Sequence, residues 1–287
     1  MTNKIGLALS GGGARGLAHI GVLEVLEHEG IVFDYLAGTS MGGLIAAAYA
    51  AGMGPELLER EALRMASVRR LLALVDLSRP RRGLFEGERV HKYLADLLGD
   101  RTFDDLQLPL TLVAVDLVAG QEVHLNQGRV ADAVRATIAI PGVFAPVERD
   151  GQLLVDGGLL NSLPADVVVG MGADVVIAVA PFSDGQAELD LMQALRRRRY
   201  IPNGLVDTAD VLWRSLEMMM KEISRRRLAE TQPQILIKPV SPPDVTWLTG
   251  FPRAAEIIAA GKKATIEALP RIQSLLASTV ALQVKGR

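Results

Sequence analysis

The chain has 287 residues, with 31 basic and 33 acidic side chains and a formal net charge of −2. This balance gives no overall positive field of the kind that draws a protein to nucleic acid. Hydrophobic residues make up 49% and charged residues 22% of a chain long enough to bury a large core, which excludes a disordered or fibrous protein. The absence of cysteine excludes disulfides, thiol nucleophiles and zinc sites built on cysteine.

Predicted strands and helices alternate in the N-terminal part of the chain. Short apolar runs over Lys4–Ser10 and Val32–Gly38 are typical of buried strands. Apolar residues recur at helical spacing over Ala14–Glu29, and Met41–Ala51 is small and apolar on all sides, as a helix packed against a sheet would be. This order predicts an α/β fold with a largely parallel, doubly wound sheet.

The rest of the chain is less regular. Helices are predicted over Pro55–Ala66, Gly87–Leu98, Val130–Ile138, from near Pro164, and over Ala187–Arg199, Leu205–Leu228 and Phe251–Leu276. Strands are predicted over Leu110–Leu117, Glu122–Leu125, Leu153–Asp156, Asp174–Ala180 and Gln234–Lys238. The simplest partition is a single domain over 1–287, with its core at about 5–181, a helical excursion near 185–232 and a C-terminal helical segment.

The apolar run at the N-terminus is too short for a signal peptide. No stretch of the sequence reaches the roughly 18 apolar residues that a membrane span needs. We therefore expect a cytoplasmic protein, and peripheral contact with the inner membrane face stays open.

Gly38–Gly42 has the GxSxG pattern and falls where a predicted strand turns into a predicted helix. A serine at so sharp a turn has a strained backbone, and glycines two residues before and after it let the chain pack closely. The hydroxyl is then exposed at the positive end of the helix, where negative charge is tolerated. Ser40 is therefore a candidate nucleophile. The alternative is that it is a serine without a catalytic role in a glycine-rich turn.

Ser10–Gly16 follows the first predicted strand and contains three successive glycines. Backbone N–H groups in such a loop can point at an anion, either a bound phosphate or the oxyanion of an acyl-transfer intermediate. A dinucleotide site needs an acidic residue at the end of the second strand, but Asp34 lies at that strand's beginning. Because Ser40 occupies the end of that strand, the oxyanion interpretation is favoured.

A serine nucleophile needs a base, and the four histidines lie on predicted helices or on the outer face of a strand. Asp156 is a better candidate, because it ends a predicted strand and is followed by Gly157 and Gly158. A carboxylate alone can take the proton if its surroundings raise its basicity. Three glycine-flanked sites at the carboxyl ends of predicted parallel strands would converge on one edge of the sheet.

SGGGARG, GTSMG and DGG together resemble the motifs of the patatin-like phospholipase family, and GGGARGLAHIGVLEVLEHEGI is similar to its compact bacterial members. The resemblance implies a three-layer α/β fold and a hydrolase with a Ser–Asp dyad and no histidine. It implies Ser40 as nucleophile, Asp156 as its base, and oxyanion N–H groups at Gly11, Gly12 and Gly13. We expect no cofactor and no metal.

The other motif residues follow from the same resemblance. Arg15 matches the basic residue of the family's glycine loop, with a surface or loop-bracing arginine as the alternative. The supporting glycines are Gly16, Gly38, Gly42, Gly157 and Gly158. Plant members have Asp at the position of Ser10 and Ala at that of Gly158, and neither difference removes a catalytic group.

The expected reaction is cleavage of fatty acyl esters of lipids, in the manner of a phospholipase A or lysophospholipase. The alternatives are a transacylase, a soluble carboxylesterase acting on small esters, or a module that binds a phosphate ligand at Gly11–Gly16. Apolar segments at Leu71–Leu77, Met218–Met220 and Trp247–Phe251 are candidates for an acyl tunnel or a bilayer contact, against ordinary core packing. Arginine groups at 69–70, 79–82, 196–199 and 225–227 either meet lipid headgroups or are solvated.

Overall fold

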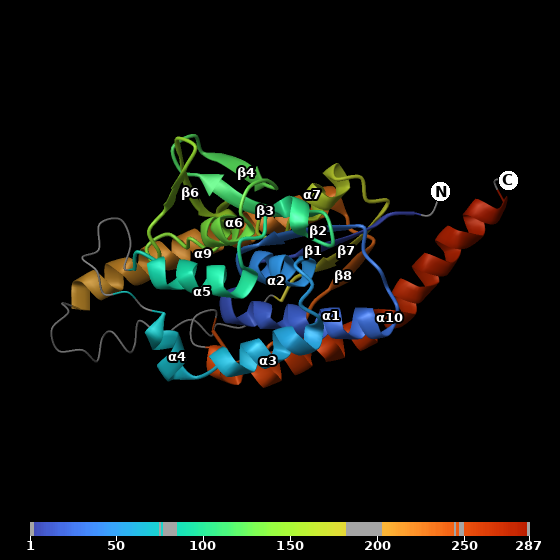
Figure 1. Cartoon of the computed structure of the whole chain (residues 1–287), viewed down its shortest axis with the longest axis horizontal. Helices are drawn as coiled ribbons and strands as arrows, with labels where there is room; N and C mark the ends of the chain where they lie inside the picture. Colours follow the sequence, from blue (N-terminus) through green and yellow to red (C-terminus); the bar gives the residue numbers. More distant parts are fainter. Residues whose placement is uncertain are drawn as a thin grey trace.

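The computed structural model of the chain describes residues 3–74, 76, 85–181, 203–243, 245–246 and 250–285 (Figure 1). The predicted helix Ala187–Arg199 and the arginine groups at 79–82 and 196–199 lie outside the described residues. The described part of the predicted helical excursion is a single helix, α9 (Asn203–Thr231).

The centre of the molecule is an eight-stranded sheet in the order β5-β6-β3-β2-β1-β7-β8, with β4 also paired to β3. Parallel pairing joins β1 to β2 and β7, β2 to β3, and β7 to β8, so the prediction of a mostly parallel sheet is confirmed. The strands are β1 (Ile5–Leu9), β2 (Tyr35–Thr39), β3 (Leu110–Asp116), β4 (Gln121–Leu125), β5 (Val147–Arg149), β6 (Gln152–Asp156), β7 (Val175–Val179) and β8 (Ile235–Ile237).

Helices cover both faces of the sheet, which gives three layers (Figure 1). Alternate residues of each strand face opposite layers: Leu7 and Leu9 of β1 pack in one core, and Ala8 packs in the other. One face is covered by α7 (Ala165–Gly170) and α9. The other carries α1 (Ala18–His28), α2 (Ser40–Ala50), α3 (Pro55–Met65), α5 (Glu88–Leu98), α6 (Val130–Thr137) and α10 (Ala254–Lys285).

The strand that ends at Asp156 does not run in the predicted direction. β6 pairs with β3 antiparallel, so the prediction of a third parallel strand is wrong. A short apolar run carries no signal of direction. The signal that was available is the pair Asp150-Gly151, whose φ angles of 52° and 79° make the two-residue hairpin turn between β5 and β6.

Two strands nevertheless approach one edge of β3 from opposite directions. β2 pairs with β3 as far as Thr39 opposite Val113, and β6 ends with Asp156 opposite Ala114. β4 pairs with Leu112–Asp116 of β3, which overlaps both the part of β3 paired with β2 and the part paired with β6. Because β4 therefore occupies the opposite edge of β3, β2 and β6 share one edge. The C-terminal ends of β2 and β6 therefore meet at adjacent residues of β3.

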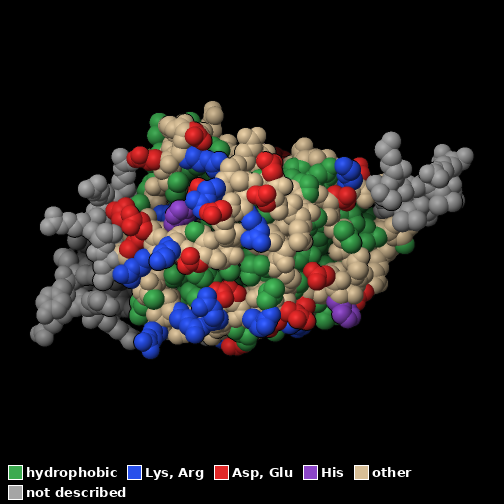
Figure 2. All heavy atoms as spheres, in the orientation of Figure 1, with side chains coloured by type: hydrophobic (Ala, Val, Ile, Leu, Met, Phe, Trp, Pro, Cys, Tyr) green, Lys and Arg blue, Asp and Glu red, His purple; other side chains and the backbone are tan. Residues whose placement is uncertain are grey.

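Figure 2 shows acidic and basic side chains interspersed over the face that it displays. Many of the basic residues are paired with acidic neighbours one helical turn away, as Arg64 is with Glu61 and Arg225 is with Glu222. In the described part of the chain, no helix combines the length and the hydropathy that crossing a bilayer requires.

Candidate active site

Ser40 occupies the sharp turn between β2 and α2. Its φ of 54° is positive, as the strained turn predicted from GxSxG requires, and its side chain is largely buried. A side chain at Gly42 would overlap the backbone carbonyls of Leu9 and Ser10 at the end of β1. At Gly38 a Cβ would come within 2.6 Å of the Gly43 Cα atom. The two glycines therefore allow α2 to start directly against the sheet.

The backbone of Ser40 is held by a residue that sequence reasoning missed. The Ser40 N–H donates to Thr137 Oγ1 at 3.0 Å, and the Thr137 hydroxyl donates to the Val113 carbonyl at 2.5 Å. Thr137 is fully buried at the end of α6. It therefore links the turn of Ser40 to β3, and no spacing in the sequence indicates this contact.

Asp156 lies beside Ser40 at the end of β6. One of its carboxylate oxygens accepts the Gly158 N–H at 2.8 Å, and the carboxyl group lies near enough to the Ser40 hydroxyl for that hydroxyl to lower its pKa. Burial raises the pKa of Asp156 from 3.8 to about 6, and the Ser40 hydroxyl and the Gly158 N–H oppose part of that rise. A carboxylate of this basicity, in contact with a hydroxyl, can accept the hydroxyl proton near neutral pH.

The glycine loop lies against the same pair. Gly12 and Gly13 have positive φ angles of 151° and 56°, and their N–H groups donate to no partner in the described part of the chain. The Gly11 N–H instead donates to the Ser162 carbonyl at 2.9 Å. Of the three predicted oxyanion donors, Gly11 therefore has a paired N–H group, and the N–H groups of Gly12 and Gly13 have no partner among the described residues.

The remaining predicted residues lie around this loop. Arg15 is buried, lines the cavity in front of Ser40, and donates from Nε to the Val245 carbonyl at 3.0 Å. Gly16 leaves room for Met41, and Gly157 packs against the Val113 carbonyl. The structure thus brings together the predicted residues of all three motifs.

His19 is a further residue that holds the loop. It is fully buried in α1, and burial lowers its pKa to about 4, so the ring is neutral at physiological pH. Its Nε2 lies 2.8 Å from the Ser10 carbonyl, which can only accept, so Nε2 carries the proton. His19 therefore lies on a helix, as predicted, and also fixes the residue that precedes the three glycines.

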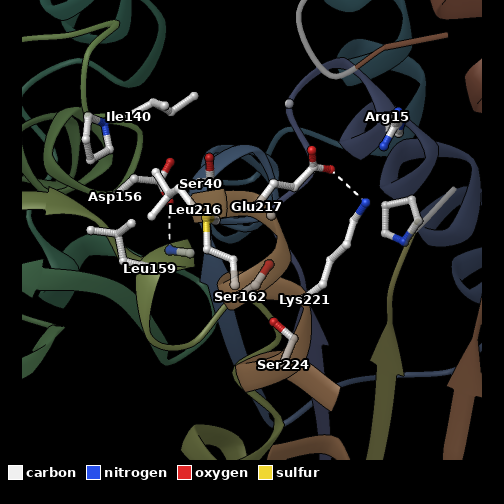
Figure 3. Close-up of a pocket in the computed structure, with 17 residues that line it drawn as sticks. Arg15, Ser40, Ile140, Asp156, Leu159, Ser162, Leu216, Glu217, Lys221 and Ser224 are labelled. Carbon is white, nitrogen blue, oxygen red and sulfur yellow. Dashed lines mark hydrogen bonds and ion pairs between the residues drawn. The ribbon is translucent and has the colours of Figure 1, made fainter. Parts of the chain in front are cut away.

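Ser40 and Asp156 open into a cavity of about 130 Å³ (Figure 3). The glycine loop and Ser162 form part of its wall, and α9 contributes Glu217 and Lys221, whose side chains pair at 2.9 Å. None of the described residues that line this cavity is a histidine. The carboxylates among these lining residues are Asp156, beside Ser40, and Glu217, which is paired with Lys221.

A polar cluster anchors α9 beside the site. Arg227 of α9 pairs with Glu122 at 2.7 Å and with Asp166 at 2.9 Å, and the Asn161 amide donates to the same two carboxylates. The Asn161 carbonyl in turn accepts the Thr39 hydroxyl at 2.8 Å. Arg227 is thus part of the framework around Ser40, although the sequence left it as either a headgroup contact or a solvated residue.

The family model for patatin-like phospholipases matches residues 7–169, which include the glycine loop, Ser40 and Asp156. The chain belongs to the patatin-like phospholipase family. The motifs that carried the resemblance in the sequence are therefore family motifs, and the structure gathers them around one cavity.

This chain is similar in sequence to several known proteins, and the similarity covers only part of the length of each of them. An uncharacterized NTE family protein of Mycobacterium bovis is 41% identical over 177 residues, which cover 62% of this chain and 49% of the relative. Patatin-like phospholipase domain-containing protein 6 of Mus musculus is 38% identical over 194 residues, which cover 65% of this chain and 14% of that protein. Neuropathy target esterase sws of Drosophila melanogaster is 35% identical over 192 residues, or 65% of this chain and 13% of that protein.

The fold is also similar to a solved structure. The crystal structure of VipD from Legionella pneumophila matches 94% of this chain and 67% of its own, with a TM-score of 0.53 and 14% sequence identity. At this identity the likeness concerns the fold alone.

Proposed function

We propose that this chain is a serine acyl hydrolase that cleaves fatty acyl ester bonds of lipids, in the manner of a phospholipase A or lysophospholipase. The observation that carries the proposal is that Ser40, at its strained turn, and the buried Asp156 carboxyl lie side by side in one cavity, whose described lining residues include no histidine. Membership of the patatin-like phospholipase family supports the choice of a lipid ester as substrate.

The proposed reaction has two steps. Ser40 Oγ attacks the ester carbonyl carbon while Asp156 accepts the hydroxyl proton, and the N–H groups of Gly12 and Gly13 stabilise the oxyanion. The C–O bond to the alcohol breaks, and the alcohol leaves with the proton from Asp156. Water then attacks the acyl carbonyl carbon while Asp156 accepts a proton from the water. The bond to Ser40 Oγ breaks, Asp156 passes that proton to Oγ, and the fatty acid is released.

The test combines active-site labelling with turnover of a short-chain aryl ester. A fluorophosphonate probe should label the wild type, and Ser40→Ala should abolish both labelling and turnover. Asp156→Asn should lower turnover by at least about 10³ without unfolding the protein. Ser162→Ala, at a second serine that lines the same cavity, should still be labelled. Near-normal turnover by Asp156→Asn would refute the dyad.

Two alternatives give different results in the same experiments. A transacylase forms the same acyl-enzyme and transfers the acyl group to an added alcohol rather than to water, so product analysis identifies it. A phosphate-binding module at Gly11–Gly16 would give no labelling and would be stabilised thermally by nucleotides or phosphate.

The proposal includes peripheral contact with a lipid surface. Val211, Leu212, Met218 and Met219 of α9 are exposed, and the same helix lines the cavity through Met220. The double variant Met218→Asp/Met219→Asp should therefore bind less to sedimented vesicles than the wild type does. Ile266→Asp, at an exposed position of α10, serves as the control and should leave binding unchanged.

A further inference from the structure

Two cavities meet at Ser40. The smaller, of about 130 Å³, contains Asp156 and the charged residues of α9. The larger, of about 360 Å³, extends from Ser40 between α2, α3 and α5. Gly13, Ser40 and Ile140 line both. A group attached to Ser40 therefore has two directions open to it.

Three helices present the same kind of face to the larger cavity. In each helix the lining residues follow the i, i+3, i+4, i+7 spacing of a single helical face, which normally packs directly against a neighbour. These residues are Met41, Leu44, Ile45 and Ala48 of α2, Leu58, Glu61, Ala62 and Met65 of α3, and Val90, Tyr93, Leu94 and Leu97 of α5. Because the three faces surround an apolar space that reaches Ser40 instead of packing against one another, we infer that this space is kept for a ligand.

The wall of the larger cavity selects for an apolar ligand. Two of these helical residues have polar side chains, Glu61 and Tyr93. The Tyr93 hydroxyl donates a hydrogen bond to the Glu61 carboxylate at 2.7 Å, and Glu61 also accepts a hydrogen bond from Arg64 at 2.7 Å. Their polar atoms are therefore engaged within the protein. The residues that surround them are aliphatic, aromatic or methionine side chains, including Phe85 and Phe144.

We propose that the larger cavity binds the acyl chain of the ester cleaved at Ser40 and limits its length. An apolar cavity of about 150 Å³ takes up benzene, which has six carbons, so about 360 Å³ corresponds to roughly 14 carbons. The alcohol part of the substrate occupies the smaller cavity, beside Glu217 and Lys221. This inference rests on the proposed function, because it takes Ser40 as the atom that holds the acyl group.

Aryl esters of increasing chain length, from two to 18 carbons and below their micellar concentration, test the limit. Each added methylene that enters the cavity should raise kcat/KM by up to about fourfold, which corresponds to about 0.8 kcal/mol. The rise should stop at about 14 carbons, the volume limit on the same scale. A rate that does not depend on chain length, or that still rises at 18 carbons, would overturn the proposal.

A variant that fills the cavity sharpens the test. Ala62→Leu adds three carbons to the wall, so the best chain length should fall by about three carbons. Ala95→Leu makes the same change on α5 at a residue outside the lining and should leave the optimum where it is. If Ala62→Leu does not fold, Ala48→Leu repeats the test from α2. An unchanged optimum in a folded cavity variant contradicts the assignment.

A binding experiment separates this inference from the proposed function. In the Ser40→Ala variant, a fluorescent fatty acid should bind and be displaced by fatty acids, with weaker binding when Ala62→Leu is added. If the short ester is hydrolysed but neither chain length nor cavity filling matters, the acyl assignment fails and the proposed function stands. If no ester is hydrolysed and Ser40 is not labelled, the proposed function fails.

Discussion

Replacing Asp156 by asparagine should stabilise the protein while it removes activity. Burial raises the pKa of this carboxyl from 3.8 to about 6, so the folded state resists its ionisation. At 1.36 kcal/mol per pH unit, ionised Asp156 lowers the free energy of unfolding at pH 7 by about 3 kcal/mol relative to a neutral side chain. Asparagine remains neutral and can keep the hydrogen bond to the Gly158 N–H, and the Ser40 hydroxyl can rotate to accept from its amide.

The sign of the effect fixes its pH window. An acid whose pKa is higher in the folded state favours folding while it is protonated, below 3.8, and that advantage is lost as the pH rises through about 6. Denaturant unfolding at pH 7 should therefore show Asp156→Asn to be more stable than the wild type by about 3 kcal/mol. At pH 4 the difference should shrink to below about 1 kcal/mol.

Asp104→Asn is the matched control, because Asp104 is exposed on a surface turn and the same substitution there should not stabilise the protein. Equal stability of Asp156→Asn and the wild type at pH 7 would refute the reasoning. So would a gain that is as large at pH 4 as at pH 7.

Three further predictions follow from the same contacts. The kcat/KM for a soluble aryl ester should fall about tenfold per pH unit below about 6, because only ionised Asp156 accepts a proton, and a flat profile down to pH 5 would contradict this role. Thr137→Val should cost about 1–3 kcal/mol of stability and lower kcat, because the Ser40 N–H and the Val113 carbonyl, both buried, lose their hydroxyl partner. Thr137→Ser should keep both hydrogen bonds, so equal kcat in the two variants would contradict this role of Thr137. Arg227→Met should destabilise the protein by about 2 kcal/mol in thermal unfolding, because the carboxylates of Glu122 and Asp166 lose their cation. Arg226→Met, at an exposed ion pair, should change the stability little, and similar losses in both variants would contradict the role of the polar cluster.

Strong local patterns predicted much of the fold. Most predicted helices and strands among the described residues are present within a few residues of their expected ends, because apolar periodicity and glycine stops are local signals. The strand expected from Val32 begins only at Tyr35, and the helix expected from Ala14 begins as a 3₁₀ turn, Gly13–Leu17. The three-residue β5 and the six-residue α4 (Val68–Ala73) were missed because they are too short to show a period.

The candidate site was predictable where glycines mark it and not where tertiary contacts complete it. GxSxG and Asp-Gly-Gly indicated Ser40 and Asp156 because close backbone approach demands glycine. Thr137 and Asn161 have no such signal, since an isolated threonine or asparagine gives no indication of its distant partner. The pairing of the Gly11 N–H likewise depends on Ser162, which is far away in the sequence.

Because β2 and β6 meet head-on along β3, the backbone of β3 sets the distance between the proposed nucleophile, Ser40, and the proposed base, Asp156. Because these strands end opposite the neighbouring residues Val113 and Ala114, the chain between Ser40 and Asp156 can gain or lose whole loops without altering that separation. A single residue inserted between Val113 and Ala114 would instead move the two strand ends apart by about 3.3 Å, out of hydrogen-bond reach. Length variation in such a protein is therefore tolerable in the loops between the two residues but not at this step of β3.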